Sequence, residues 1–206
     1  MLITGASRGI GAQTALQYAR AGASLSLVAR TQSALDTSKD AILREHPSAK
    51  VLTFPTDVRD VKKAEEVVAA TVAHFGRLDI LIANAGILRP MDKRMLRMNT
   101  AILVADLCHL LKPLHRRIQT GGGMSLRSIF GAPTTSSSAH LIYSLIISQA
   151  YQVLSSFAVP ELLKTKGQVV VLVSTASQVR VPNSSEYCTS KHAILRFAEF
   201  VKLGNY

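Results

Sequence analysis

The chain has 206 residues, 48% of them hydrophobic, which excludes a disordered chain and indicates one globular domain with a sizeable core. Its two cysteines, Cys108 and Cys188, exclude a disulfide framework and favour a reducing compartment, for which we expect the cytoplasm. The net charge is +11, and the segment between Arg89 and Arg127 supplies +6 of it, with eight Lys/Arg and two Asp. No aromatic residues that could stack on bases are interleaved with these basic residues, so we expect no nucleic-acid partner.

The first element is a short apolar run, Met1-Leu2-Ile3, which predicts a strand, and because the chain enters this strand at Met1 we expect no signal peptide. A glycine turn follows, Thr4-Gly5-Ala6-Ser7-Arg8-Gly9-Ile10-Gly11, and then a helical pattern from Ala12 to Ala21 closed by Gly22. Strand, glycine turn and helix in this order are typical of a phosphate-binding site, because the helix start offers unpaired N–H groups and a partial positive charge. We assign Gly5 to the tight turn, Gly9 to close backbone approach to a pyrophosphate, and Gly11 to helix–strand packing.

Strands and helices then alternate along the chain, which predicts an α/β fold with a doubly wound parallel sheet. Asp60 is a candidate N-cap and Gly76 a candidate C-terminal stop for one of the helices. The apolar run from Gln168 to Ser174 suits a parallel strand that is buried on both faces. The predicted strands are residues 24–29, 50–54, 78–83 and 168–174, and the predicted helices are residues 33–46 and 61–75.

The middle of the chain departs from this alternation. Residues 100–114 and 140–163 have helical patterns, whereas residues 119–138 are rich in Gly and Ser and predict a loop of a length unusual inside a compact domain. Residues 139–159 carry no Lys, Arg, Asp or Glu, yet their serines and glutamines lower the apolar density below that of a bilayer helix. We therefore predict a buried helix there and no membrane partner.

Candidate nucleotide-binding residues follow three of the predicted strands. Arg30 directly follows the second strand, where dinucleotide folds read the adenosine ribose, and Arg8 in the glycine turn can face the same place. An arginine there suits a 2′-phosphate, so NADP is favoured over NAD, the alternative being two solvated surface arginines. Asp57-Val58 follows the third strand and Asn84-Ala85-Gly86 the fourth, and either stretch alone would be an ordinary loop.

The candidate catalytic residues lie near the end of the chain. Tyr187 and Lys191 are four residues apart, and on a helix they share one face. An ammonium beside a phenol favours the phenolate and lowers its pKa from about 10, which makes Tyr187 a candidate general acid or base. Ser174 precedes Tyr187 at the end of a predicted strand, with Ser177 as its local competitor. Cys188 and the six His show no metal-ligand spacing, so no metal is expected.

Taken in order, these motifs resemble the short-chain dehydrogenase/reductase family. The resemblance implies an oxidoreductase that interconverts a small-molecule carbonyl and a secondary alcohol by hydride transfer, with tyrosine as general acid and base. The implied cofactor is NADP(H), with NAD as the second choice. It implies catalytic roles for Ser174, Tyr187, Lys191 and, in Met98-Asn99-Thr100, Asn99. The implied cofactor-binding residues are Gly5, Ser7, Arg8, Gly9, Ile10, Gly11, Arg30, Asp57, Val58, Asn84, Ala85, Gly86, Tyr187 and Lys191.

Three departures from the family pattern define an alternative. The segment between Gly86 and Asn99 is short, extra residues separate Asn99 from Tyr151, and the family continues beyond the position of Tyr206 with a substrate-covering part. We therefore predict a single dinucleotide-binding domain over residues 1–206, with an irregular insertion at about residues 100–150 and an incomplete C-terminal part. The alternative function is a catalytically incompetent relative that at most binds nucleotide. The resemblance also implies a homo-oligomer, although the extra residues fall on the helix with much of the usual dimer surface.

Overall fold

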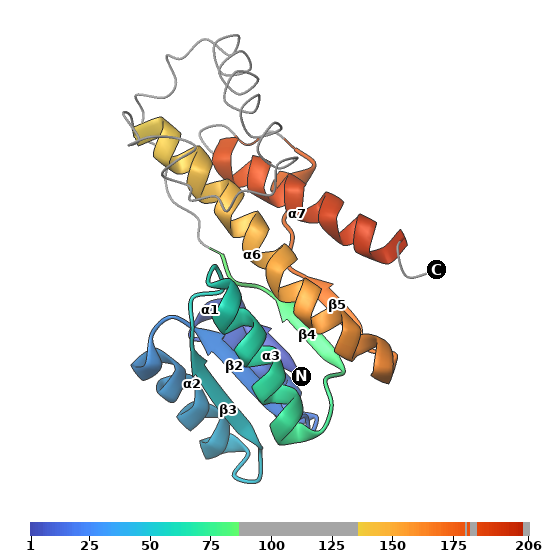
Figure 1. The fold of residues 1–206 in the computed structure, drawn as a ribbon. Helices are drawn as coiled ribbons and strands as arrows, with labels where there is room; N and C mark the ends of the chain where they lie inside the picture. Colours follow the sequence, from blue (N-terminus) through green and yellow to red (C-terminus); the bar gives the residue numbers. More distant parts are fainter. Residues whose placement is uncertain (87–135, 180, 182–184, 204–206) are drawn as a thin grey trace.

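The described part of the chain forms a five-stranded parallel sheet with helices on both faces (Figure 1). The computed structural model describes residues 1–86, 136–179, 181 and 185–203. Its main elements are β1 (Leu2–Thr4), α1 (Gly9–Arg20), β2 (Leu25–Ala29), α2 (Gln32–Glu45), β3 (Val51–Pro55), α3 (Val61–Phe75), β4 (Ile80–Ala83), α6 (Ser136–Thr165), β5 (Gln168–Val171) and α7 (Ser185–Leu203). The strand order is β3-β2-β1-β4-β5, which confirms the predicted doubly wound α/β fold.

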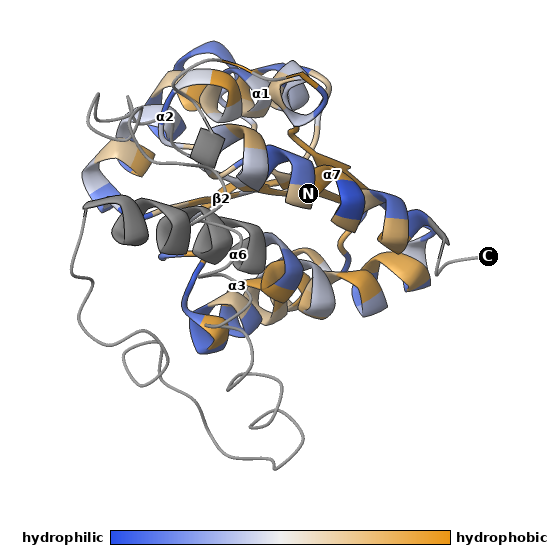
Figure 2. Cartoon of the chain, turned by 90° about the horizontal axis from the view of Figure 1, so that it is seen from above, coloured by the Kyte–Doolittle hydropathy of each residue, from blue (hydrophilic) through white to orange (hydrophobic). Residues whose placement is uncertain are grey.

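One face of the sheet is covered by α1 and α2 (Figure 2). Successive residues of a strand point to opposite faces, so Ile3 of β1 and Leu27 of β2 reach this side. They pack with Ala15 of α1 and with Leu35 and Ile42 of α2, all of which are buried. Both helices therefore bury an apolar stripe against the strands and leave their polar side to solvent.

The opposite face is covered by α3 and α6 (Figure 2). Leu2 of β1 and Val28 of β2 point to this side and pack with Val68 of α3 and with Leu154 and Leu162 of α6. The helix α3 begins at the predicted cap, where the Asp60 side chain accepts a hydrogen bond from the Lys63 N–H at 3.2 Å. It ends at Gly76, whose φ of 76° places it in the left-handed region that favours glycine. Both predicted ends of this helix are confirmed.

The order of the strands creates a crevice between β1 and β4. From β1 the chain proceeds outward to β2 and β3, then crosses back to place β4 and β5 on the other side of β1. The strand order thus reverses at β1, and ligands of such sheets bind beyond the carboxyl ends of the strands at this point. The fold thus brings the glycine turn after β1 and the Asn-Ala-Gly stretch after β4 to one edge.

Some boundaries differ from those predicted. The strand β5 ends at Val171 instead of residue 174, because its partner β4 ends at Ala83 and the last ladder bond is Leu172 N–H to Ala83 O at 3.0 Å. The helix α6 begins at Ser136, so residues 136–138 are helical and not part of a loop, and it continues past Pro160 to Thr165. None of the described helices combines the length and apolar character needed to cross a bilayer. The predicted helix at residues 100–114, residues 119–135 of the predicted loop and most of the predicted insertion lie outside the described residues.

Candidate active site

The glycine turn connects β1 to the start of α1 and forms one wall of a cleft. Gly5 and Gly9 have φ values of 66° and 58°, a conformation that residues with a side chain rarely adopt. Gly11 is required for space instead, because a Cβ there would lie 2.6 Å from Asn84 Nδ2 and would also collide with the Gly5 carbonyl oxygen. At the start of α1, the side chain of the capping residue Arg8 accepts no hydrogen bond from the helix. The first N–H groups of the helix are therefore not capped by this side chain and can bind an anion.

A buried hydroxyl ties this turn to the segment after β4. Thr4 Oγ1 accepts hydrogen bonds from the N–H groups of Asn84 and Ala85, both at 3.0 Å, and donates to Ile82 O at 3.3 Å. The Asn84 amide in turn donates to Thr4 O at 2.8 Å and to Gly5 O at 3.2 Å. These bonds fix the Asn-Ala-Gly stretch against the glycine turn. Thr4 was not among the predicted site residues, although its place at the start of the glycine turn was the available signal.

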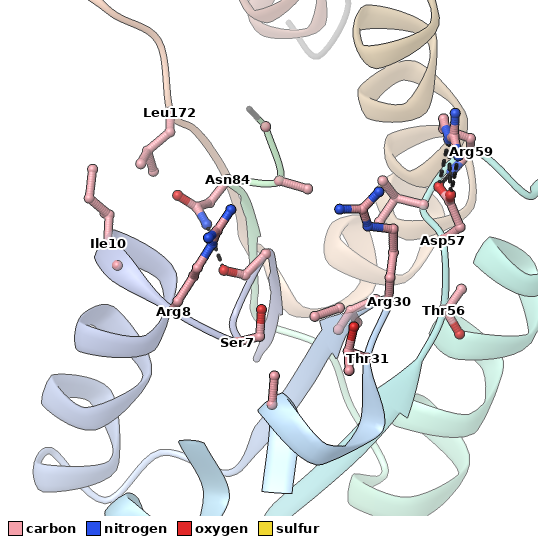
Figure 3. Close-up of a pocket in the computed structure, with 18 of the residues that line it drawn as sticks. Ser7, Arg8, Ile10, Arg30, Thr31, Thr56, Asp57, Arg59, Asn84 and Leu172 are labelled. Carbon is pink, nitrogen blue, oxygen red and sulfur yellow. Dashed lines mark hydrogen bonds and ion pairs between the residues drawn. The ribbon is translucent and has the colours of Figure 1, made fainter. Parts of the chain in front are cut away.

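A cluster of charged residues forms the end of the cleft next to β2 and β3 (Figure 3). Arg30 follows β2 and Asp57 follows β3, as predicted. The guanidinium of Arg59, which the sequence analysis did not single out, donates from Nε to both Asp57 carboxylate oxygens at 2.9 and 3.0 Å, and from Nη2 to Oδ2 at 2.5 Å. These bonds from Arg59 hold the pKa of Asp57 below its ordinary value, and the charge of Arg30 acts in the same direction.

The other end of the cleft is formed by one face of α7. Tyr187 and Lys191 lie on this face, with Lys191 Nζ 5.9 Å from the centre of the Tyr187 ring. Lys191 is buried and donates from Nζ to Leu172 O at 2.6 Å, and its burial lowers the pKa of the ammonium. The spacing of four residues on a helix therefore brings phenol and ammonium together, as predicted.

A buried tyrosine contacts the lining of the cleft near this end. The hydroxyl of Tyr151, on α6, donates to Ala85 O at 2.6 Å, and its ring packs with Ala83 and with Ile194 of α7. Burial raises the pKa of this phenol, and the nearby Tyr187 raises it further. Tyr151 therefore stays protonated and connects α6 to the Asn-Ala-Gly stretch. No sequence signal indicated this contact, since 66 positions separate the two residues.

The remaining predicted catalytic residues are placed differently. Ser174 caps a short 3-10 helix (Thr175–Ser177), and its Oγ accepts a hydrogen bond from the Ala176 N–H at 3.2 Å. Its competitor Ser177 is buried and donates from Oγ to Ser174 O at 2.6 Å, which directs the Ser177 hydroxyl into the turn. Ser174 is not among the residues that line the cleft, although its neighbour Val173 is. Asn99 lies outside the described residues.

The cleft brings together most of the predicted cofactor-binding residues. Its volume of about 700 Å³ falls in the range of small-molecule sites. Gly11 is the one predicted cofactor residue that does not line it, because it packs behind the turn. The described part of the chain contains no group of three His, Cys, Asp or Glu that could hold a metal. The predicted residues that line the cleft are Gly5, Ser7, Arg8, Gly9, Ile10, Arg30, Asp57, Val58, Asn84, Ala85, Gly86, Tyr187 and Lys191.

Comparison with known proteins identifies this arrangement. The 11-beta-hydroxysteroid dehydrogenase-like 3 protein of Arabidopsis thaliana is 31% identical over 203 residues, which cover 98% of this chain and 53% of the relative. The chain thus spans about half the length of the curated relatives that it matches over nearly its whole length. Levodione reductase has a crystal structure with a TM-score of 0.73 and 26% identity, covering all of this chain and 66% of that one.

Two further comparisons also give dehydrogenases. The structure of NAD⁺-bound xylitol dehydrogenase gives a TM-score of 0.74 at 20% identity, covering 98% of this chain and 63% of that one, a likeness of fold alone. Residues 1–108 match the family model described as short chain dehydrogenase. With the parallel sheet, the glycine turn and the cleft already in place, this match shows that the chain belongs to the short-chain dehydrogenase family.

Proposed function

We propose that the chain is an NADP(H)-dependent oxidoreductase that interconverts a carbonyl and a secondary alcohol, with Tyr187 as general acid and base. One observation carries the proposal: Tyr187 and Lys191 line the same cleft as the glycine turn and Arg30. A nucleotide-binding wall and a candidate proton donor therefore face one space. The family membership makes an oxidoreductase the expected class.

The residues of the cleft fit a dinucleotide. The start of α1 and the positive-φ glycines Gly5 and Gly9 offer backbone N–H groups and room for a pyrophosphate. Val58, beside Asp57, lines the end of the cleft where an adenine would lie, and Gly86 of the Asn-Ala-Gly stretch also lines the cleft. When bound, the nicotinamide dinucleotide supplies or accepts the hydride.

The choice of NADP over NAD depends on two arginines. Arg30 follows β2 at the position that reads the adenosine ribose, and Arg8 lines the same cleft from the glycine turn. A guanidinium forms paired, charge-assisted hydrogen bonds with a phosphate, whereas a 2′-hydroxyl would be better bound by a carboxylate. The preference for NADP rests on these side chains and not on the solved neighbours, one of which contains NAD⁺.

Tyr187 would exchange the proton with the substrate oxygen. The Lys191 Nζ lies 5.9 Å from the centre of the Tyr187 ring, and its hydrogen bond to Leu172 O keeps the ammonium in place beside the proposed proton donor. Ser174 would donate a hydrogen bond to the same substrate oxygen. Its Oγ already accepts the Ala176 N–H, which leaves the hydroxyl proton available to a ligand. Asn99 keeps its proposed family role, and the cytoplasm remains the proposed location.

The test compares cofactor binding with turnover on one protein preparation. Binding of NADPH and NADH is measured by calorimetry, and oxidation of NADPH is followed with a panel of ketones that includes a ketosteroid and levodione. Tyr187→Phe should abolish turnover while the dissociation constant of NADPH changes less than about threefold, because the phosphates are held by the glycine turn. Tyr18→Phe is the matched control, since Tyr18 packs against the core on α1 and does not line the cleft.

Each outcome separates the alternatives. Turnover that survives in Tyr187→Phe would place the proton donor elsewhere and contradict the mechanism. NADPH binding without turnover of any ketone by the unmodified chain would instead support the alternative of a nucleotide-binding relative without catalysis. Absence of binding of both nucleotides would refute both.

A further inference from the structure

The adenosine end of the cleft is lined by more positive than negative side chains. Three guanidinium groups line it, those of Arg8, Arg30 and Arg59. Asp57 is the one acidic side chain among the described residues that line the cleft. Figure 3 shows the Arg30 side chain between Arg8 on one side and the pair of Asp57 and Arg59 on the other. A group that binds at this end therefore meets a net positive charge, which the Asp57 carboxylate reduces.

Without its pairing to Arg59, the Asp57 carboxylate would oppose the binding of a phosphate in two ways. Its carboxylate is close enough to Arg30 for the two charges to interact, so it would repel a nearby dianionic group. It would also compete with that group for Arg30, because a carboxylate and a phosphate both match the planar guanidinium fork. Arg30 forms no ion pair within the described residues, so its guanidinium is available to one of the two.

Arg59 removes this competition by its geometry. Its Nε and Nη2 reach both oxygens of Asp57, and its backbone N–H adds a further bond to Oδ1 at 3.0 Å. The carboxylate is therefore paired with a guanidinium that lies on the side of Arg30 opposite to Arg8 (Figure 3). The pair is partly exposed, with 39% of the Arg59 side chain and 31% of the Asp57 side chain accessible, so solvent weakens but does not abolish its field.

We propose that Arg59 determines cofactor specificity: by pairing with Asp57 it leaves Arg30 free to bind a 2′-phosphate, and so favours NADPH over NADH. This inference rests on the proposed use of a nicotinamide dinucleotide and assigns a positioning role to a residue that need not touch the nucleotide. The alternative is an ordinary surface ion pair that contributes little. Arg77 and Asp79 form such a pair with the same spacing, at 2.5 Å, outside the cleft.

The experiment is a double-mutant cycle on the preference for NADPH, defined as the ratio of the NADH to the NADPH dissociation constant measured by calorimetry. Arg59→Gln should lower this ratio about fivefold, the size of one charge interaction across a partly solvated cleft, and less at high salt. Asp57→Asn should not lower it. In the Asp57→Asn background, Arg59→Gln should have no further effect, because the competitor for Arg30 is then absent. Arg59→Lys should restore part of the loss, and Arg77→Gln should change nothing.

The outcomes distinguish this inference from the proposed function. A ratio that Arg59→Gln leaves within twofold of the unmodified value overturns the inference alone. An equal loss in the Asp57→Asn background also overturns it, since Arg59 would then act without Asp57. An unmodified chain that binds NADPH no more tightly than NADH overturns the proposed cofactor choice and this inference with it. Arg59 and Arg77 are exposed and Asp57 is half-buried, and circular dichroism melts verify that each variant is folded.

Discussion

The hydroxyl of Thr4 gives the sharpest test of how the cleft is built. Thr4 is only 2% exposed, and Thr4→Val replaces the hydroxyl by a methyl group of nearly the same size. The change leaves the N–H groups of Asn84 and Ala85 without the acceptor that each contacts at 3.0 Å. An unsatisfied buried donor costs about 1–3 kcal/mol, and both donors are only partly buried, so we expect a loss of about 2–4 kcal/mol in the free energy of unfolding.

Urea unfolding followed by circular dichroism measures this loss, and thermal unfolding gives a second value. For a chain of this size, about 2–4 kcal/mol corresponds to a fall in Tm of roughly 5–15 °C. Thr4→Ser is the control, because it keeps the hydroxyl and should retain most of the stability. A Thr4→Val variant that melts within about 2 °C of the unmodified chain would refute the reasoning, since the two N–H groups would then have found other partners.

Two further predictions concern the glycine turn and the charge pair. Gly11→Ala should lower the free energy of unfolding by several kcal/mol more than Gly9→Ala, because the new Cβ at position 11 would collide with Asn84 and with backbone atoms. Gly9 has open space around it, so Gly9→Ala should cost only about 1–2 kcal/mol, through the positive φ at this position. Similar urea midpoints for the two variants would contradict this prediction. The hydrogen bonds from Arg59 hold the pKa of Asp57 below its ordinary value, so the pairing stabilises the fold above that ordinary value and the contribution is lost as the pH falls through the lowered pKa. Carboxyl NMR titration should show a higher pKa for Asp57 in Arg59→Gln, and an unchanged value would show that Arg59 is not the cause.

Much of the fold could be predicted because strands and helices leave local signals. Uninterrupted apolar runs located the strands, and the cap Asp60 and the stop Gly76 located both ends of α3. The end of β5 was predicted wrongly because the apolar run continues to residue 173, while the length of a strand is set by its partner. The start of α6 was missed because Ser136 and its neighbours read locally as loop residues.

In the candidate site, too, residues with a local sequence signal were predicted and residues that act through distant contacts were not. Residues within one motif, such as Tyr187 and Lys191, were predicted because helical spacing alone brings them together. Thr4 and Tyr151 act through contacts with residues about 80 and 66 positions away, and no single-sequence pattern encodes such distances. Arg59 is different, since it lies two residues from Asp57 and the pair could have been suspected from the sequence.

The strand order also has a consequence for chain entropy. The pairing of β1 with β2 joins residues 2 and 26, 24 positions apart, whereas the pairing of β4 with β5 joins residues 80 and 168, 88 positions apart. Because the entropy lost on closing a loop grows with the logarithm of its length, the second pairing is less favourable by about 1 kcal/mol. Buried contacts of Leu154 and Leu162 with the α3 side of the core offset this loss. The pairing of β4 with β5 thus depends more on apolar packing than the pairing of β1 with β2.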